Sequence, residues 1–278
     1  TGRVIIMQRQ GSSWVEVDVI GDDVTGALFG FDVAVDVAFG QTYFIVGAPT
    51  SYSTAGIVRV YQWDDGDQYA KELFSVLDPQ WSGTATSRFG EAVDINVTNT
   101  DQIRFAVGNP WQFGPDGYGS ISIFDANDTG FAWIYGNYTN SLPYSDQFAL
   151  SGGFCATNID LDDDLLIVSM PQSTGLYYEQ GGAVIYEGND LTGNGVLDWS
   201  FSYLLSLQLP GNGDLAGHDV AIDASSGIAV IGVPGLDYTG VNSGAVAPFR
   251  FDGFDWRTDM MLISSVPQPG VAIGKSVS

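Results

Sequence analysis

Histidine and cysteine, on which much of protein chemistry depends, each occur once in this chain of 278 residues. The histidine, His218, lies in LAGHDVAID, on what reads as a core strand. A Ser-His-Asp system would have to use it, but a structural histidine is commoner in such a place. The cysteine, Cys155, cannot form an internal disulfide, and its solitary state excludes cysteine-based zinc sites. With no Gly-x-Ser-x-Gly elbow and no phosphate-cradling loop either, we expect no catalytic residues.

Oxygen ligands for a hard cation are the other chemistry that this aspartate-rich chain could support. The segment DLTGNGVLD, residues 190–198, has Gly195 at the sixth position, where a calcium loop bends sharply. Its candidate calcium ligands are Asp190, Thr192, Asn194 and Asp198. Phe201 stands at position twelve, so the carboxylate that closes an EF-hand is missing, and an ordinary Asn-Gly hairpin is the alternative. The acidic run at 160–164 is too short for such a loop and indicates a solvated turn.

The charge balance excludes several classes of partner. The chain has 33 acidic and 9 basic residues, a net charge of −24. Phosphate backbones and anionic lipid surfaces would be repelled, so we expect no nucleic-acid partner and no binding to a membrane surface. So few basic residues also disfavour phosphoryl transfer. The sequence has no run of roughly 18 apolar residues, so we expect no membrane insertion.

A sequence repeat organises the elements that must position these residues. The tetrapeptides VGAP, VGNP, VSMP and IGVP recur at intervals of 61, 61 and 63 residues, ending at Pro49, Pro110, Pro171 and Pro234. After each proline come a loop, a glycine and an alternating run, such as GIVRVYQW from Gly56. Before each proline lies another alternating element, such as LFGFDVAVD at 28–36. Several independent signals therefore keep one period.

Each repeat contains four strand candidates of ordinary length, about five to nine residues. The second of them, such as YFIVGAP at 43–49, is continuously apolar, as expected of a strand covered on both faces. A sheet of four short strands cannot bury its own faces, so the copies must pack on one another. This pattern predicts an all-β fold, a β-propeller of four-stranded antiparallel blades. The blades are expected at about 28–80, 88–140, 152–207 and 215–265.

The two ends of the chain carry incomplete copies of the repeat. The segment 2–20 matches only the third and fourth strands, and 271–278 matches only the beginning of a first strand. A blade made from both ends would lack its second strand. We therefore expect the single propeller region, 1–278, to be a fragment of a seven-bladed ring, with a self-contained five-bladed ring as the alternative.

These repeats resemble FG-GAP repeats, the blades of integrin α-subunit propellers and of many secreted proteins. The resemblance rests on Phe29-Gly30, on Phe89-Gly90 and on Gly-Ala-Pro at 47–49, repeated over nearly the whole chain. It implies a propeller, usually seven-bladed and extracellular, used for binding or as an architectural element. The family's calcium loop between the first two strands is absent, since none of the four corresponding connections has its alternating oxygen ligands.

Strand alternation predicts which loops share a face. The 1–2 and 3–4 hairpins of every blade should lie on one face of the disc, and the 2–3 loops on the other. Three glycosylation sequons occur, at Asn96, Asn127 and Asn137. Asn96 is expected in a 1–2 hairpin, Asn127 in a 3–4 hairpin on the same face, and Asn137 late in an outer strand. Together with the family resemblance, the sequons favour a secreted glycoprotein.

The opposite face is expected to carry an aromatic rim. Its 2–3 loops contain Tyr52, Trp111, Phe113, Tyr118, Tyr177, Tyr178 and Tyr238. Aromatic side chains, several with a polar group, on a face without glycans suit contact with a protein or a carbohydrate. The alternative is that these side chains fold back and fill gaps between blades.

The sequence thus predicts an extracellular or cell-surface, non-catalytic adhesion, recognition or structural module that binds a protein or glycan through its 2–3 loops. Calcium is the only cofactor that we expect. One alternative is an architectural subunit of an extracellular filament, sheath or wall, with homo- or hetero-assembly. The other is a carbohydrate-active propeller enzyme, because a glycosidase needs only two suitably separated carboxylates.

Overall fold

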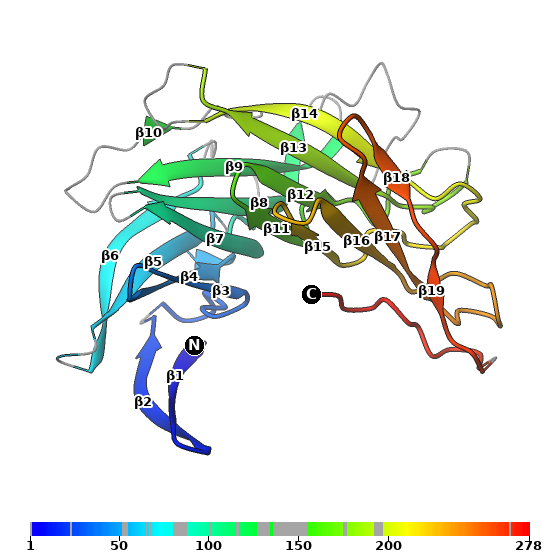
Figure 1. Cartoon of the computed structure of the whole chain (residues 1–278). Helices are drawn as coiled ribbons and strands as arrows, with labels where there is room; N and C mark the ends of the chain where they lie inside the picture. Colours follow the sequence, from blue (N-terminus) through cyan, green and yellow to red (C-terminus); the bar gives the residue numbers. More distant parts are fainter. Residues whose placement is uncertain are drawn as a thin grey trace. The chain divides into compact units, whose positions relative to one another are not determined.

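The chain is described as a computed structural model (Figure 1). The structure describes residues 2–22, 24–51, 55–64, 66, 68–79, 88–99, 102–114, 117–126, 134–135, 155–174, 177–191, 197–266 and 268–278. At Asn99, within 111–118 and at 134–135 it describes the backbone alone. Every named element in these ranges is a β-strand, and all strand pairs are antiparallel. The prediction of an all-β chain of antiparallel sheets is therefore confirmed.

The strands form one two-stranded ribbon and four larger sheets, each with its strands in chain order. The N-terminal ribbon consists of β1 (Arg3–Gln10) and β2 (Ser13–Gly21). Sheet A consists of β3 (Val33–Ala38), β4 (Gln41–Ala48), β5 (Ile57–Asp64) and β6 (Tyr69–Leu77). Sheet B consists of β7 (Ala92–Asn99), β8 (Gln102–Gly114), β9 (Gly117–Ala126) and β10 (Ile134–Tyr135).

Sheets C and D complete the set. Sheet C consists of β11 (Ile159–Asp162), β12 (Leu165–Ser169), β13 (Ala183–Asn189) and β14 (Asp198–Leu205). Sheet D consists of β15 (Val220–Asp223), β16 (Ile228–Val233), β17 (Ala245–Phe251), β18 (Trp256–Thr258) and β19 (Leu262–Ile263). Because β18 and β19 both pair with β17, they divide the place of a fourth strand between them.

The second strand of each sheet is the most continuously buried, as its apolar composition predicts. In β4 all six residues from Tyr43 to Ala48 are buried, and in β12 all but Leu165 are buried. The first strand instead alternates, as β3 does, because only one of its faces packs on a neighbouring sheet. Neighbouring sheets therefore supply the apolar cover that a single four-stranded sheet lacks.

Sheet B departs from the predicted pattern at its 2–3 connection. The loop PWQFGPDGYG is instead largely strand, since β8 continues through Pro110 to Gly114 and β9 resumes at Gly117. In the other three sheets the second strand ends before the corresponding proline. The repeat, in which a loop follows each proline, led us to predict a strand end there, as the missing N–H of proline would also favour.

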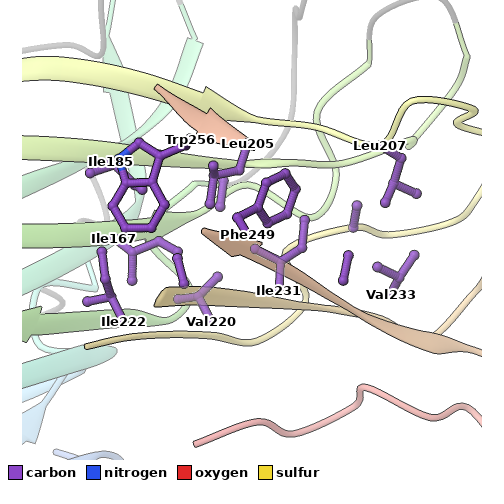
Figure 2. Packing of buried hydrophobic residues seen from close by; sticks show 14 residues of the cluster. Ile167, Ile185, Leu205, Leu207, Val220, Ile222, Ile231, Val233, Phe249 and Trp256 are labelled. Atoms are coloured by element: carbon purple, nitrogen blue, oxygen red, sulfur yellow. The ribbon is translucent and has the colours of Figure 1, made fainter. Parts of the chain in front are cut away.

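The chain divides into two compact units, residues 1–112 with 123–135 and residues 113–122 with 136–278. In the first unit, Val4, Ile6 and Ile20 of the N-terminal ribbon pack on one face of sheet A, and apolar residues of β4 and β5 on its other face pack against sheet B. In the second unit, sheets C and D enclose one cluster, in which Ile167 and Ile185 lie beside Val220, Ile222 and Trp256 (Figure 2). Face-to-face packing of consecutive sheets is thus common to both units.

No helix in the part of the chain that the structure describes is long and apolar enough to cross a membrane.

Candidate functional site

A glycine shortly before the third strand contacts the beginning of the next repeat. These glycines have positive φ, and they form isolated parallel bridges in three places: Gly56 with Phe89, Gly181 with Ala216, and Gly244 with Ile273. A Cβ on Gly56 would lie 2.1 Å from the carbonyl oxygen of Phe89, so only glycine permits the contact. The 2–3 loop of one sheet is therefore anchored at its end to the following sheet.

The glycine of the VGAP and IGVP tetrapeptides makes a second close approach between sheets. A Cβ on Gly47 would lie 2.0 Å from the carbonyl oxygen of Gly90, and one on Gly232 would lie 1.8 Å from that of Gly274. Backbone therefore packs directly on backbone where these sheets meet. The Phe-Gly and Gly-Ala-Pro signatures therefore lie on the two sides of one recurring backbone contact between neighbouring sheets, which we call the joint.

Aspartates on the first strands connect neighbouring sheets beside these glycines. In the first unit, the carboxylates of Asp32 and Asp36 accept the backbone N–H of Val93 at 2.8 Å and of Val97 at 2.6 Å. In the second unit the same relation holds for three pairs: Asp160 with Ile222, Asp162 with Ala224, and Asp219 with Val277. These bonds span 58 to 62 residues of sequence, close to the repeat length. These bonds satisfy backbone N–H groups of β7, of the β15 hairpin and of the C-terminal segment.

This result changes the interpretation of the acidic run at 160–164. The turn that the sequence predicted is present, because Asp163 and Asp164 connect β11 directly to β12. Asp160 and Asp162, however, are not parts of a solvated turn, since their carboxylates bind the backbone of sheet D. The run therefore contains two inter-sheet residues and a two-residue turn.

The third repeat has Cys155-Ala156 where the first two have Phe-Gly. Ala156 keeps the positive φ of the missing glycine, at 57°, and donates its N–H to Ser169, as Gly30 donates to Gly47. Cys155 is buried against Gly119, where an added Cβ would lie 2.5 Å from its Sγ. Burial raises the pKa of the Cys155 thiol to about 12, so the thiol is neutral and belongs to the core.

Three of the seven predicted rim aromatics have side chains that the structure describes, and all three are exposed. Tyr177 and Tyr178 lie in the 2–3 loop of sheet C, and Tyr238 lies in the 2–3 loop of sheet D. Tyr178 is 65% exposed and Tyr238 is 66% exposed. The same loops and the C-to-D connection also expose Leu209 and Val241, which the sequence prediction missed. We call these five residues the rim.

Backbone bonds hold the rim loops together. The loop of Tyr178 bonds to the C-to-D connection, because the Tyr178 N–H binds Asn212 Oδ1 and the Tyr178 carbonyl accepts from Gly213. That connection in turn touches the next 2–3 loop, where Gly235 donates to Asp214. The loops that carry Tyr178 and Tyr238 are therefore both hydrogen-bonded to one segment, the connection at 211–215.

The charge at the rim is negative. Burial raises the pKa of Asp214, and the charge of Asp237 raises it further, while the Gly211 N–H acts in the opposite direction. The neighbouring Glu179 raises the pKa of Tyr178 through a hydrogen bond and through its charge. Tyr178 is therefore a neutral phenol at physiological pH, able to donate a hydrogen bond. This combination suits neutral or cationic ligands with hydroxyl groups or apolar faces.

The other predicted rim residues cannot be placed in this way. Tyr52 lies outside the described residues. Trp111 and Phe113 lie in β8 and Tyr118 lies in β9, so the expectation that these three are in a loop is wrong. Their side chains are outside the described part of the structure.

The predicted calcium loop is described only at its ends. Asp190 directly follows β13, and Asp198 opens β14 opposite Asn189. Thr192 and Asn194 lie outside the described residues. Within the described ranges, no group of three or more histidine, cysteine, aspartate or glutamate side chains could hold a metal ion. Calcium binding by this hairpin stays a prediction.

The predicted glycosylation sites are also only partly described. Asn96 lies inside β7, opposite Arg104, and not in the hairpin where we expected it. Its Oδ1 is buried, and glycosylation at this site stays a prediction. Asn127 and Asn137 lie outside the described residues.

His218 makes the hydrogen bonds that the structure shows through its backbone. It follows Gly217 at the joint between sheets C and D, and its carbonyl accepts a hydrogen bond from Asn158 Nδ2 at 2.7 Å. Its backbone N–H bonds to Leu215 and Gly232. This placement fits the reading of His218 as part of the strand framework.

No protein-family model matches this chain, and a search of curated proteins finds no match. Among solved structures, the chain is similar to a functionally unknown protein from Desulfotomaculum acetoxidans, with a TM-score of 0.51 and 11% sequence identity. The alignment covers 98% of this chain and 67% of that protein. At this identity the likeness concerns the fold alone.

Proposed function

We propose that the chain is part of a secreted, FG-GAP-type β-propeller that binds a protein or glycan through the rim. The observation that supports a propeller most strongly is the recurrence of one joint. The same glycine approach, bridge and aspartate bond connect sheet A to sheet B and sheet C to sheet D. Twisted sheets that repeat one face-to-face joint with a constant rotation fan around an axis, with the first strands innermost.

The rim supports a recognition role. Aromatic side chains with hydroxyl groups provide large contact areas and lose little conformational entropy on binding. Hydrogen bonds connect their loops to the segment 211–215, so a partner would bind a largely preformed surface. The negative charge beside them disfavours phosphorylated or acidic partners. We therefore propose a neutral oligosaccharide or an uncharged to basic protein surface as the ligand class, without turnover.

A glycan array and a panel of purified extracellular matrix proteins would test this function. The wild-type chain should bind at least one ligand, and Tyr178→Ala with Tyr238→Ala should weaken that binding by about tenfold or more. Tyr69→Ala is the matched control, because Tyr69 is an exposed tyrosine on β6, outside the rim. Equal binding by the rim variant and the control would refute the role of the rim. Release of product from a glycan would refute the non-catalytic assignment.

An architectural subunit is the second candidate function, and one observation favours it. Sheet D exposes apolar side chains near its outer strands, with Phe254 95% exposed and Met260 81% exposed. Exposed apolar side chains on a sheet margin are suited to lateral assembly. Ordered polymers of the purified chain in electron micrographs, lost in Phe254→Ser with Met260→Ser, would support this function.

A further inference from the structure

One dipeptide, Asn212-Gly213, connects the segment 211–215 to the loop of Tyr178. Tyr178 uses both of its backbone groups there: its N–H donates to Asn212 Oδ1 at 3.0 Å, and its carbonyl accepts the N–H of Gly213 at 2.9 Å. We call these two hydrogen bonds the clasp. Asn212 is exposed, so water has access to it.

The segment that follows sheet D shows which residue of the dipeptide the turn requires. Gly270 corresponds to Gly213, since its φ is 77° against 75° and its N–H donates at 2.9 Å to the carbonyl of Val241, the counterpart of Tyr178. The residue before Gly270 is Pro269, whose side chain accepts no hydrogen bond. The glycine therefore belongs to the turn, whereas the asparagine is particular to the connection between sheets C and D.

An asparagine that precedes a glycine is able to react with its own backbone. The glycine nitrogen attacks Cγ of the asparagine, the bond from Cγ to Nδ2 breaks, and ammonia leaves with the proton of the glycine N–H. Glycine favours this attack because no side chain hinders its nitrogen. Water then opens the resulting succinimide. Opening at Cγ gives aspartate, and opening at the former backbone carbonyl gives isoaspartate, in which the chain runs through Cβ and Cγ.

The clasp opposes this reaction in the folded chain. The attack requires that the Gly213 nitrogen lose its proton and turn toward Cγ of Asn212. In the closed loop that N–H is donated to the Tyr178 carbonyl, and Asn212 Oδ1 is held by the Tyr178 N–H. Both bonds must open first, as the bond of an amide must before hydrogen exchange. The rate of the reaction therefore follows the local opening of the loop.

The two products differ in whether the clasp can close again. Aspartate keeps the chain geometry and offers a carboxylate oxygen to the Tyr178 N–H, which is a stronger acceptor than an amide. In isoaspartate the former Oδ1 and the Gly213 N–H belong to one peptide unit. The C=O and N–H of a trans peptide point in opposite directions, so they cannot both bond to Tyr178. Isoaspartate therefore breaks the clasp.

We propose that Asn212-Gly213 is a site of spontaneous deamidation, gated by the clasp, whose isoaspartyl product releases Tyr178 from the segment 211–215. The reaction needs water alone. The release is local, because the carbonyls of Glu179 and Gln180 still accept the N–H groups of Leu215 and Ala216. The modification thus loosens one part of the rim and leaves the packing of sheets C and D intact.

The rate of deamidation at Asn212 tests the gate. The wild-type chain is incubated at mildly alkaline pH, native or in urea, and analysed by peptide mapping with mass spectrometry. The native rate should be about tenfold or more below the rate in urea, because the loop is open for only part of the time. Asn194-Gly195, the other Asn-Gly of the sequence, should react at a closely similar rate to Asn212 in urea.

Two variants at one position separate the backbone from the side chain. Tyr178→Pro removes the N–H that holds Asn212 Oδ1 and should raise the native rate several-fold, whereas Tyr178→Ala keeps this N–H and should stay within about twofold of the wild type. If Tyr178→Pro does not fold, the native and urea-treated wild-type rates still decide. Equal rates in those two states would overturn the proposal, as would a native chain that forms no isoaspartate at Asn212 after prolonged incubation.

Hydrogen exchange of the Gly213 amide tests the release. The purified isoaspartyl chain should exchange this amide about tenfold or more faster than the wild type, and Asn212→Asp should exchange it at nearly the wild-type rate. The Leu215 amide, bonded to Glu179, is the internal control and should be unchanged in both. Unchanged Gly213 exchange in the isoaspartyl chain, or equal acceleration in Asn212→Asp, would refute the release. None of these readouts uses a ligand, so a failure here is distinct from a failure of the proposed recognition role.

Discussion

The hydrogen bonds from Asp160 and Asp162 to sheet D allow a quantitative prediction of how much the contact between sheets C and D contributes to stability. Each carboxylate accepts one backbone N–H, at 2.6 Å from Ile222 and at 2.8 Å from Ala224. A hydrogen bond to a charged group contributes about 1.5–3 kcal/mol, and a buried N–H left without a partner costs about 1–3 kcal/mol. Ile222 is 93% buried, so its N–H cannot turn to water, whereas Ala224 lies in a more accessible turn.

Asp160→Ala should therefore destabilise the second unit by about 2 kcal/mol, and Asp162→Ala by about 1 kcal/mol. For a unit of this size, 1 kcal/mol corresponds to about 2–4 °C in Tm, so the double variant should unfold about 6–12 °C lower. Asp160→Asn should recover part of the loss, because its amide oxygen can still accept the bond. Urea unfolding followed by tryptophan fluorescence would measure these differences in free energy.

Asp164→Ala is the matched control, because it removes the same charge from the exposed turn of the same hairpin. We expect it to change the free energy of unfolding by less than about 0.5 kcal/mol. If Asp160→Ala and Asp164→Ala are equally stable, the carboxylate does not join the sheets. The explanation of the 62-residue separation between Asp160 and Ile222 would then be wrong.

Three further predictions concern buried polar groups. Arg104→Ala should cost about 3–5 kcal/mol in urea unfolding, because it removes the cation 2.8 Å from the buried Asp125 carboxylate; a loss below about 1 kcal/mol would contradict this. Cys155 should resist maleimide labelling in the native protein and react in urea, because burial raises its pKa; rapid native labelling would place it outside the core. The raised pKa of Asp214 means that its contribution to stability is present below its ordinary pKa and is lost as pH rises through the folded-state value. Asp214→Asn should therefore lose less stability than the wild type between pH 3.5 and pH 7 in urea titrations, and an unchanged pH dependence would refute the assignment.

The strand order was predictable because the repeat places several sequence features at nearly constant intervals. The tetrapeptide ending at Pro49, the glycine at 56 and the alternating run before Val46 have a periodicity that only strands explain. Their structural counterparts are a buried second strand, a glycine joint and a half-covered first strand. Local composition and global packing agree at these positions, so sequence reasoning succeeds there.

The departures arise where a residue's role depends on a distant segment. Asp160 and Asp36 read as solvent-facing acids, and only the neighbouring sheet shows that their carboxylates bind backbone groups about sixty residues away. A signal was present, because aspartates recur on the first strands, but the sequence alone does not show which segment they face. The strand continuation past Pro110 also departs from the prediction, since the pattern shared by the repeats places a loop after each proline.

The candidate site was only partly predictable for a related reason. Tyr177, Tyr178 and Tyr238 were found because loop position in an antiparallel sheet follows from strand order. Leu209 and Val241 were missed, since a single apolar residue in a loop carries no sequence signal that tells an exposed side chain from a buried one.

The proposed β-propeller requires that the sheets fan around an axis with their first strands innermost. Spin-label distances test it directly, in a Cys155→Ala background with one labelled pair on first strands, at Val35 and Asp223, and one on outer strands, at Lys71 and Arg257. A propeller predicts that the outer pair is clearly farther apart than the inner pair, because both pairs connect the same two sheets, A and D. Equal separations would mean that the sheets lie in a straight stack, and the propeller assignment would be contradicted.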